Sequence, residues 1–441
     1  MTKSNTSFFQ LLLYALPALP LAALTLPLYI IVPTFYTETL GLPLAAVGTA
    51  LLAVRIFDAV NDPLIGWAAD KWHPSFGRRR AVMGQSLPIA ALAGFMLFAP
   101  PEDATAWYLF TWAALLTIGF TGVSLPYSAW GAEMSGDYAT RARITGVREG
   151  FTLVGTLIAI ALPFALGMDS AEGWHGLAIL GVFVAAGLVV LGAVSILTLP
   201  EPTEYSTASL SLGDGLKSMA GNVAFLRLIF AFFINGLANG IPATLFLYFV
   251  SSVIGDESLR GPLLFLYFLC GILGVPLALW AARRTSKHRA WCYAMVAVCL
   301  VFSTAPLLGE GDVWLFTLIC ISNGICLGFD IVLPAAIQAD VIDADTAKSG
   351  EQRSGTYFAA WSLATKLSLA LGVGIAFPVL GAFGFNTTAG AVNTPEALFA
   401  LAVVYAWIPV ALKIIAIGLM WNFPLGKAEQ LELREKIEAR G

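Results

Sequence analysis

Two aspartates and an asparagine lie close together inside a long apolar stretch of the chain. Asp58, Asn61 and Asp62 belong to an apolar segment from about residue 42 to 69, which is long enough to cross a bilayer as a helix. Residues three and four apart share one face of a helix, so these three side chains point the same way. Two carboxylates at membrane depth need a positive partner. We therefore predict that a cation binds between them.

The composition around this charged stretch is that of a polytopic membrane protein. The 441 residues are 58% hydrophobic and 12% charged, whereas soluble domains carry about 25% charged residues. Twelve apolar spans are long enough to cross the bilayer, near residues 8–36, 42–69, 81–100, 106–130, 145–167, 177–199, 223–252, 260–283, 289–308, 313–338, 356–383 and 396–423. The fold class that we predict is therefore all-α and polytopic, with twelve transmembrane helices.

Two kinds of residue within these spans bear on structure. Four prolines, at positions 17, 20, 27 and 33, predict that the first span is bent or irregular. Five cysteines lie between residues 270 and 326 without a CxxC pair. They indicate no metal site or disulfide framework, and we interpret them as small apolar packing residues.

Lysines and arginines collect on one side of the predicted spans. With the N-terminus inside, the inner loops and the C-terminal tail hold nearly all the basic residues of the loops, whereas the outer loops hold Arg260 alone. The positive-inside rule therefore predicts that both termini are cytoplasmic. The short loops indicate a bacterial inner-membrane protein.

A polar stretch rich in Ser, Gly and Pro follows the sixth span and divides the chain in two. We predict a six-helix bundle over 1–199, a cytoplasmic linker over 200–222, a second six-helix bundle over 223–423 and a tail over 424–441 that forms a short amphipathic helix. The polar residues that follow the second and fourth spans recur weakly after the eighth and tenth. Two pseudo-symmetric six-helix bundles are the plan of a major-facilitator transporter, whose substrate site lies near the midplane.

The charged stretch of the second span resembles a family signature. Asp58-Ala-Val-Asn61-Asp62-Pro63 is similar to the Asp-Ala-x-Asn-Asp-Pro element of the glycoside–pentoside–hexuronide:cation symporters, the melibiose permease-like family of the major facilitator superfamily. The likeness continues through the Gly-Arg-Arg-Arg loop, the Leu-Pro-Tyr end of the fourth span and the Ala-Asp-Val-Ile-Asp turn after the tenth. It implies that sodium, lithium or a proton is bound by Asp58, Asn61, Asp62 and, on the fourth span, Thr121.

The same resemblance places Lys366, on the eleventh span, beside the cation site. The residue types agree, because carboxylate, amide and hydroxyl oxygens are hard ligands for hard cations and a buried lysine needs a counter-charge. Competition between the cation and Lys366 for Asp58 and Asp62 is our hypothesis for coupling, and a static salt bridge is the alternative. The two carboxylates can also bind a proton, although the neutral donors Asn61 and Thr121 favour sodium.

The substrate side departs from the family's galactoside carriers, which hold the sugar with acids on the first and fourth helices. This chain has Ser124 at the fourth-helix position, and Ser128 where those carriers have a tryptophan. We therefore do not expect galactoside binding. Polar or aromatic residues at membrane depth are the predicted solute-binding residues: Ser124, Tyr127, Arg148, Asn235, Asn239, Asn323 and Trp361. For the amides and Trp361 the alternative is packing or bonding between helices, and for Arg148 an ion pair or an anchor at the inner face.

A further set of charged residues is interpreted as gating or structural. It comprises Arg55, Arg78, Arg79, Asp330, Asp340 and Asp343. Asp330 lies inside the tenth span, where an acid is also a functional candidate. Lys413, in the last span, is expected to pair or to extend toward the interface.

We predict a secondary active transporter in which a sodium or proton gradient drives uptake of a small polar organic solute, that is, a sugar, glycoside or organic acid. The alternatives are an uncoupled facilitator or exporter of the same fold and a transporter of amphipathic lipids. No nucleotide-binding loop or HExxH motif supports an enzyme. The expected partners are the solute, the cation and the bilayer, without nucleic acid or a metal other than the coupling cation, and we expect a monomer.

Overall fold

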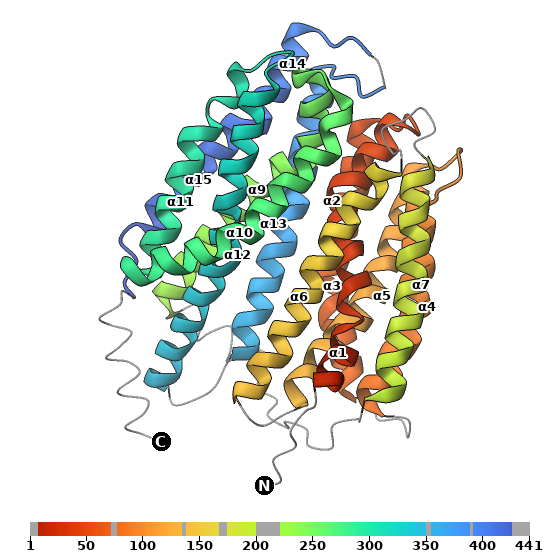
Figure 1. Cartoon of the computed structure of the whole chain (residues 1–441), viewed down its shortest axis with the longest axis vertical. Helices are drawn as coiled ribbons and strands as arrows, with labels where there is room; N and C mark the ends of the chain where they lie inside the picture. The colour runs from red at the N-terminus through yellow and green to blue at the C-terminus, as the bar shows by residue number, and fades with distance from the viewer. Residues whose placement is uncertain are drawn as a thin grey trace. The chain divides into compact units, whose positions relative to one another are not determined.

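The computed structural model describes residues 8–71, 77–134, 138–166, 174–199, 221–349, 354–388 and 391–425. Helices fill nearly all of this part of the chain, which Figure 1 colours from red at α1 to blue at α15. Within it, twelve segments are long and apolar enough to cross a membrane, from Phe8–Glu38 to Pro395–Met420. The predicted fold class, all-α with twelve membrane helices, is therefore confirmed.

The helices belong to two compact units. One unit comprises Met1–Thr207 with Asn386–Ala391, and the other comprises Ala208–Phe385 with Val392–Gly441. The predicted linker falls largely on residues 200–220 and the predicted tail helix largely on residues 426–441, and both ranges lie outside the described residues. The predicted domain limits therefore stay predictions.

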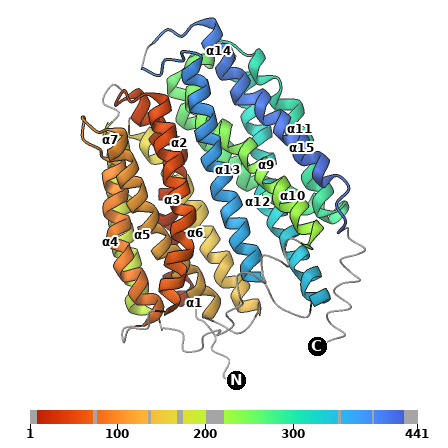
Figure 2. The same cartoon turned by 180° about the vertical axis from the view of Figure 1, so that it is seen from behind.

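The first unit is built from α-helices that pack in pairs. In it α4 contacts α5 and α7, α2 contacts α6, and α3 contacts α5, as can be followed in Figure 2. The bounds are α1 (Phe8–Ala15), α2 (Ala18–Glu38), α3 (Leu44–Lys71), α4 (Arg78–Phe98), α5 (Ala106–Glu133), α6 (Tyr138–Ala165) and α7 (Trp174–Thr198).

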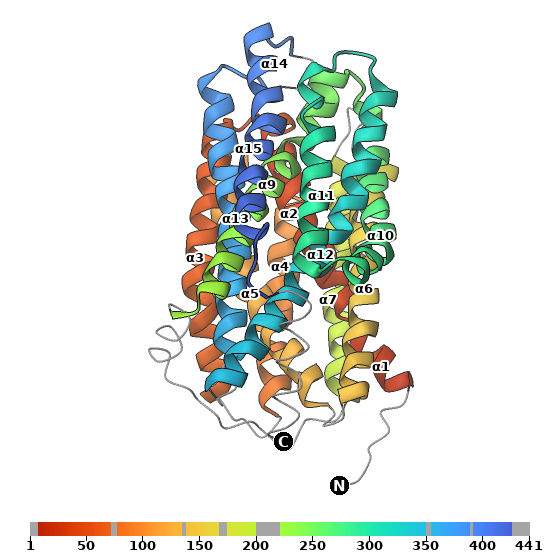
Figure 3. The ribbon, with the colours of Figure 1, turned by 90° about the vertical axis from the view of Figure 1, so that its left-hand side faces the viewer.

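The second unit combines α-helices with short π and 3-10 turns. In it α10 contacts α12, α9 contacts α13 and α15, and α11 contacts α12 and α15; Figure 3 labels these helices together. The bounds are α9 (Val223–Phe249), η1 (Val250–Ile254), η2 (Glu257–Leu259), α10 (Arg260–Arg284), α11 (Lys287–Phe302), η3 (Ala305–Leu307), α12 (Val313–Ser349), α13 (Ser354–Ala382), α14 (Pro395–Ala402), η4 (Val403–Trp407) and α15 (Ile408–Met420).

The first span is divided between α1 and α2 at Leu16 and Pro17. Proline lacks the amide hydrogen that would continue the helical ladder and disfavours helical geometry at the residue before it. Pro27 and Pro33 stay inside α2 without ending it. The predicted irregularity of this span is therefore a single break near its N-terminal end.

Helices α10 and α12 approach closely through glycines. A Cβ atom built on Gly328 of α12 would lie 2.6 Å from the carbonyl oxygen of Gly271 and 2.6 Å from the carbonyl carbon of Gly274, both on α10. Side chains at these positions would force the helices apart, so the glycines allow the backbones to touch. This contact fixes α12, which carries Asp330, against the rest of its unit.

The periphery of each unit is apolar, as a bilayer requires. Leu197 is 71% exposed in the first unit, and Leu300 and Trp314 are 69% and 83% exposed in the second. Exposed apolar side chains on helices of membrane-spanning length are expected to face lipid. The cysteines follow a different pattern, because all five lie in the second unit and three of them, Cys270, Cys292 and Cys320, are buried.

Candidate functional site

Helix α3 carries the first carboxylate of the charged stretch in a buried position. Asp58 is 2% exposed, and Oδ2 of its carboxylate accepts a hydrogen bond from Nη1 of Arg55 at 3.2 Å. The Arg55 guanidinium also lies 4.1 Å from the centre of the Tyr29 ring on α2. Arg55 therefore supplies a counter-charge to Asp58 from one turn earlier on the same helix.

Thr121 of α5 lies beside the second carboxylate. Its Oγ1 donates to Oδ1 of Asp62 at 2.7 Å, and Thr121 is itself buried. Between the two acids, Nδ2 of Asn61 is buried and has no hydrogen-bond partner among the described residues. A flip of this amide exchanges its nitrogen and oxygen, which would present Oδ1 at the same place. The set thus offers carboxylate, amide and hydroxyl oxygens, the donor chemistry that hard cations prefer.

Lys366, the predicted coupling residue, belongs to the second unit. It lies on α13 and is partly buried. The carboxylates with which it is predicted to compete lie on α3 of the first unit. The coupling hypothesis therefore stays a prediction.

Tyr127, one of the predicted solute-binding residues, is bound to the first helix. Its ring stacks on that of Tyr14, with centroids 4.7 Å apart. Tyr127 Oη donates to the Tyr14 carbonyl oxygen at 2.7 Å, and Tyr14 Oη donates to the Tyr127 carbonyl oxygen at 3.0 Å. Together these bonds fix α1 to α5. Ser124, one turn earlier on α5, is partly buried.

Arg148 of α6 is paired with its neighbour in the sequence. Nη2 of Arg148 lies 2.7 Å from Oε1 of Glu149, and Nη1 donates to Oγ of Ser128 at 3.4 Å. The side chain of Arg148 is 24% exposed and that of Glu149 is 54% exposed. Arg148 therefore forms an ion pair, one of the alternatives predicted for it, and its partner is Glu149; the pair leaves Arg148 partly accessible.

In the second unit, Asp330 of α12 is the centre of a polar cluster. Oδ1 of its carboxylate accepts hydrogen bonds from Trp291 Nε1 at 2.5 Å and Asn235 Nδ2 at 3.1 Å. Oδ2 accepts one from Asn239 Nδ2 at 2.9 Å and lies 3.6 Å from Lys413 Nζ. Two predicted solute-binding residues thus meet an acid for which the sequence predicts a gating or structural role. We call these five residues the Asp330 cluster.

Two other predicted solute-binding residues lie in the same unit. Trp361 of α13 stacks on Phe232 of α9, with centroids 3.7 Å apart and an interplanar angle of 21°. Asn323 lies on α12, seven residues before Asp330, and its Oδ1 is buried without a hydrogen-bond partner among the described residues. Residues seven apart share a helix face, so α12 presents Asn323 and Asp330 on one side.

The remaining gating candidates lie near helix ends. Lys287, at the start of α11, donates to both carboxylate oxygens of Asp340 at 2.7 Å each. Arg79 is buried in the first turn of α4. The side chains of Arg78 and Asp343 lie outside the described part of the chain. Of these predicted residues, Asp340 therefore has a defined partner within its own unit.

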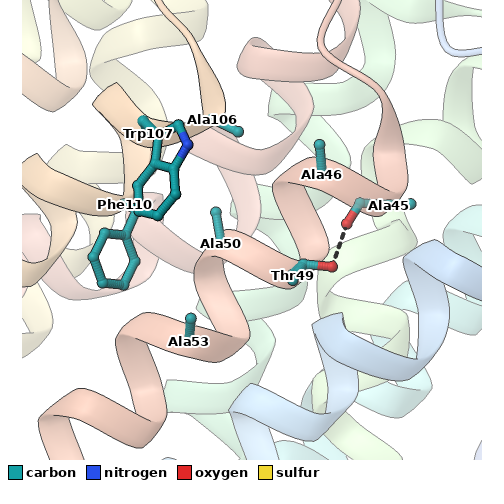
Figure 4. A pocket seen from close by; sticks show the side chains of 8 residues that line it. All are labelled: Ala45, Ala46, Thr49, Ala50, Ala53, Ala106, Trp107 and Phe110. Atoms are coloured by element: carbon teal, nitrogen blue, oxygen red, sulfur yellow. Dashed lines mark hydrogen bonds between the residues drawn. The ribbon is translucent and has the colours of Figure 1, made fainter.

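A groove of about 540 Å³ lies between α3 and the beginning of α5 in the first unit. Figure 4 shows that small side chains of α3 face two aromatic rings of α5, and that the one hydroxyl in the lining donates to a backbone oxygen of α3. Its lining residues are Ala45, Ala46, Thr49, Ala50, Ala53, Ala106, Trp107 and Phe110. The groove is apolar and contains none of the residues predicted to bind a cation or a solute.

Around Arg55 and Asp330, three residues lie in contact that were not among the predicted site residues: Tyr29, Trp291 and Lys413. Tyr29 covers the Arg55 guanidinium, and Trp291 donates to Asp330, but neither is distinguishable by type from other aromatic residues in apolar spans. Lys413 had a signal, since a lysine in the last apolar span needs a partner. Lys413 is 3% exposed and pairs with Asp330. Pairing was one of the two alternatives predicted for this lysine; extension toward the interface was the other.

Comparison with known proteins gives one family match. Residues 13–427 match the family described as MFS/sugar transport protein. Among curated relatives, the isoprimeverose transporter of Lactiplantibacillus pentosus is 25% identical over 392 residues, which cover 85% of this chain and 80% of the relative. The sodium-dependent lysophosphatidylcholine symporter 1 of Gallus gallus is 22% identical over 431 residues, covering 88% and 81%.

Solved structures give the fold. The crystal structure of the nucleoside transporter NupG superimposes with a TM-score of 0.68 at 17% sequence identity, covering 94% of this chain and 99% of the other. At this identity the likeness concerns the arrangement of helices alone. The predicted major facilitator fold is therefore confirmed.

Proposed function

Because the chain belongs to the MFS/sugar transport protein family, we propose that it couples uptake of a hydroxylated organic solute to the entry of sodium. The chain is a cation-coupled symporter of a small polar organic solute and not an enzyme. The resemblance to the glycoside–pentoside–hexuronide:cation symporters is likewise confirmed. The choice of sodium, the ligands of the cation and the class of solute are our proposals.

We assign sodium to Asp58, Asn61, Asp62 and Thr121. The observation that carries this assignment is the 2.7 Å hydrogen bond from Thr121 to Asp62, because it brings a neutral oxygen of α5 to a carboxylate of α3. A proton needs only one carboxylate oxygen, whereas sodium needs several oxygen ligands. Neutral oxygens at Thr121 and Asn61 therefore favour sodium over a proton.

The Arg55–Asp58 pair modifies this assignment. Arg55 already neutralises one of the two carboxylates, so the site carries a net charge of about −1 when Arg55 and both acids are ionised. One monovalent cation then brings the whole group to neutrality, which suits a low-dielectric surrounding.

The charge pattern of the loops supports the proposed orientation in the membrane. We propose a bacterial inner-membrane protein with both termini in the cytoplasm, acting as a monomer. In that orientation an inward sodium gradient drives solute into the cell. Lys366 is proposed as the residue of the second unit that competes with sodium for the acids of α3.

Uptake into proteoliposomes tests this function. The solutes are radiolabelled isoprimeverose, a methyl glucuronide and lysophosphatidylcholine, each with an inward sodium gradient, an inward proton gradient or no gradient. We expect sodium-stimulated uptake of a hydroxylated solute, which Asp62→Asn abolishes and Asp103→Asn, a change at an exposed acid of the same unit, does not. Uptake that ignores both gradients would identify an uncoupled facilitator, and stimulation by protons alone would exclude the sodium assignment.

A further inference from the structure

The Asp330 cluster ties together four helices of the second unit. Asn235 and Asn239 come from α9, Trp291 from α11, Asp330 from α12 and Lys413 from α15. Their donors surround one carboxylate at distances of 2.5 to 3.6 Å. All five side chains lie within predicted membrane spans, where polar groups are retained only if they are satisfied or used.

The charges of the cluster cancel. Lys413 is 3% exposed, and its Nζ lies 3.6 Å from Asp330 Oδ2 while also donating to Asn235 Oδ1 at 2.7 Å. An ionised carboxylate accepts about four hydrogen bonds, and Asp330 has four donors around it. Three of these contacts are hydrogen bonds, and the fourth, to Lys413 Nζ at 3.6 Å, is an ion pair. Asp330 is therefore already matched by a buried counter-charge and by amide and indole donors inside its own unit.

Asp330 fixes the orientation of both amides. A carboxylate accepts hydrogen bonds but cannot donate them, so each asparagine must turn its NH₂ group toward Asp330. The amide oxygen of each must then point away. For Asn235 that oxygen meets Lys413, and Asn235 is buried at 2% exposure. For Asn239 no described residue donates to Oδ1, and the side chain is partly exposed.

Asn239 thus presents an acceptor of fixed direction, and an aromatic surface lies on the same helix face. Phe232, seven residues before Asn239 on α9, stacks on Trp361, and seven residues correspond to about two helical turns, or roughly 10 Å. An oriented acceptor calls for a donor such as a hydroxyl group. The Phe232–Trp361 stack, which packs against the apolar core of the unit, makes this part of the helix face apolar.

We propose that Asp330 and Lys413 are positioning residues that orient Asn239, so that its carbonyl oxygen accepts a hydrogen bond from a hydroxyl group of the transported solute. The inference rests on the proposed function only in that the solute is taken to bind this chain. It assigns the acceptor to Asn239, the orientation to Asp330, and charge compensation to Lys413. Trp291 contributes a hydrogen bond to Asp330 that touches neither amide.

A mutant cycle on solute binding tests the proposal. The double variant Asp330→Asn with Lys413→Met removes both charges and so leaves no unpaired buried ion, the change that would most damage folding. We expect its KM for the best hydroxylated solute of the panel to rise at least tenfold, equal to about 1.4 kcal/mol, with Vmax within twofold and the sodium dependence unchanged. Asn239→Ala should raise KM to a similar extent.

The combined variant decides whether Asp330 acts through Asn239. If it does, adding Asp330→Asn and Lys413→Met to Asn239→Ala raises KM by less than threefold more. Trp314→Phe, a matched control at an exposed tryptophan of the same unit, should change KM by less than threefold. Additive effects in the combined variant, or an unchanged KM in the double variant, would overturn the proposal.

Failure of the proposed function is distinguishable from failure of this inference. If the unaltered protein shows no sodium-stimulated uptake, the dissociation constant is measured instead from the rise in melting temperature that each solute produces in detergent. The cycle then applies to that constant in the same way. Stabilisation by lysophosphatidylcholine but by neither isoprimeverose nor the glucuronide would overturn the assignment of a hydroxylated sugar-like solute.

Discussion

Replacing Arg55 by glutamine should increase the affinity of the protein for sodium. Arg55 and Asp58 form an ion pair at 3.2 Å inside the first unit, so the substitution raises the net negative charge of the proposed sodium site by one. A sodium ion on the acids would lie about 5 Å from the guanidinium, where the repulsion is about 3 kcal/mol at a dielectric constant of about 20 and about 0.8 kcal/mol at about 80. Because Arg55 and Asp58 are buried, the lower dielectric constant applies, and we predict at least a tenfold gain, equal to about 1.4 kcal/mol.

The gain is measured as the sodium concentration that half-saturates stabilisation of the purified protein against heat. Without sodium the variant should melt at a lower temperature than the unaltered protein, because Asp58 then lies buried without its counter-charge, a loss of about 3–5 kcal/mol. Sodium should restore most of that loss. Arg227→Gln, which removes an arginine that binds the Leu419 carbonyl oxygen in the second unit, is the matched control. An unchanged or weaker sodium affinity in Arg55→Gln would refute the electrostatic reasoning.

Three further predictions concern single contacts. Thr121→Val should weaken sodium binding about tenfold by removing one oxygen ligand and a hydrogen bond to a charged group of about 1.5–3 kcal/mol; a sodium titration with no change would contradict the assignment of Thr121. Tyr14→Phe should lower stability by about 1 kcal/mol through loss of its bond to Tyr127, measured as a lower melting temperature with sodium affinity unaltered. Gly328→Ala should destabilise by about 1–3 kcal/mol because its Cβ meets the Gly271 backbone, and a melting temperature equal to that of the unaltered protein would show that α10 and α12 can separate freely.

The membrane spans and the acids of α3 could be predicted because both signals are local. Twelve apolar runs of helical length stand out against polar loops, and charges inside such a run are conspicuous whatever surrounds them. The break at Pro17 was less predictable, since four prolines in the same span carry the same local signal. Which of them ends a helix depends on neighbours that can stabilise the interrupted backbone.

Contacts between helices distant in sequence could not be predicted in this way. The bond from Trp291 to Asp330 joins residues 39 apart, and that from Lys413 to Asn235 joins residues 178 apart. Apolar periodicity indicates which residues face inward but not which inward-facing residues meet. The Arg55–Asp58 pair is the opposite case, because a spacing of three places both side chains on one helix face.

The distribution of cysteines has a practical consequence for following the motion of the transporter. The described first unit contains no cysteine, and buried thiols such as Cys270, Cys292 and Cys320 react slowly with alkylating probes. With the two partly buried cysteines, Cys299 and Cys326, replaced by serine, Ala53→Cys in the groove of Figure 4 becomes the reactive thiol for a spectroscopic label. A label at position 53 would thus measure changes around the first unit during transport, with little labelling of the second unit.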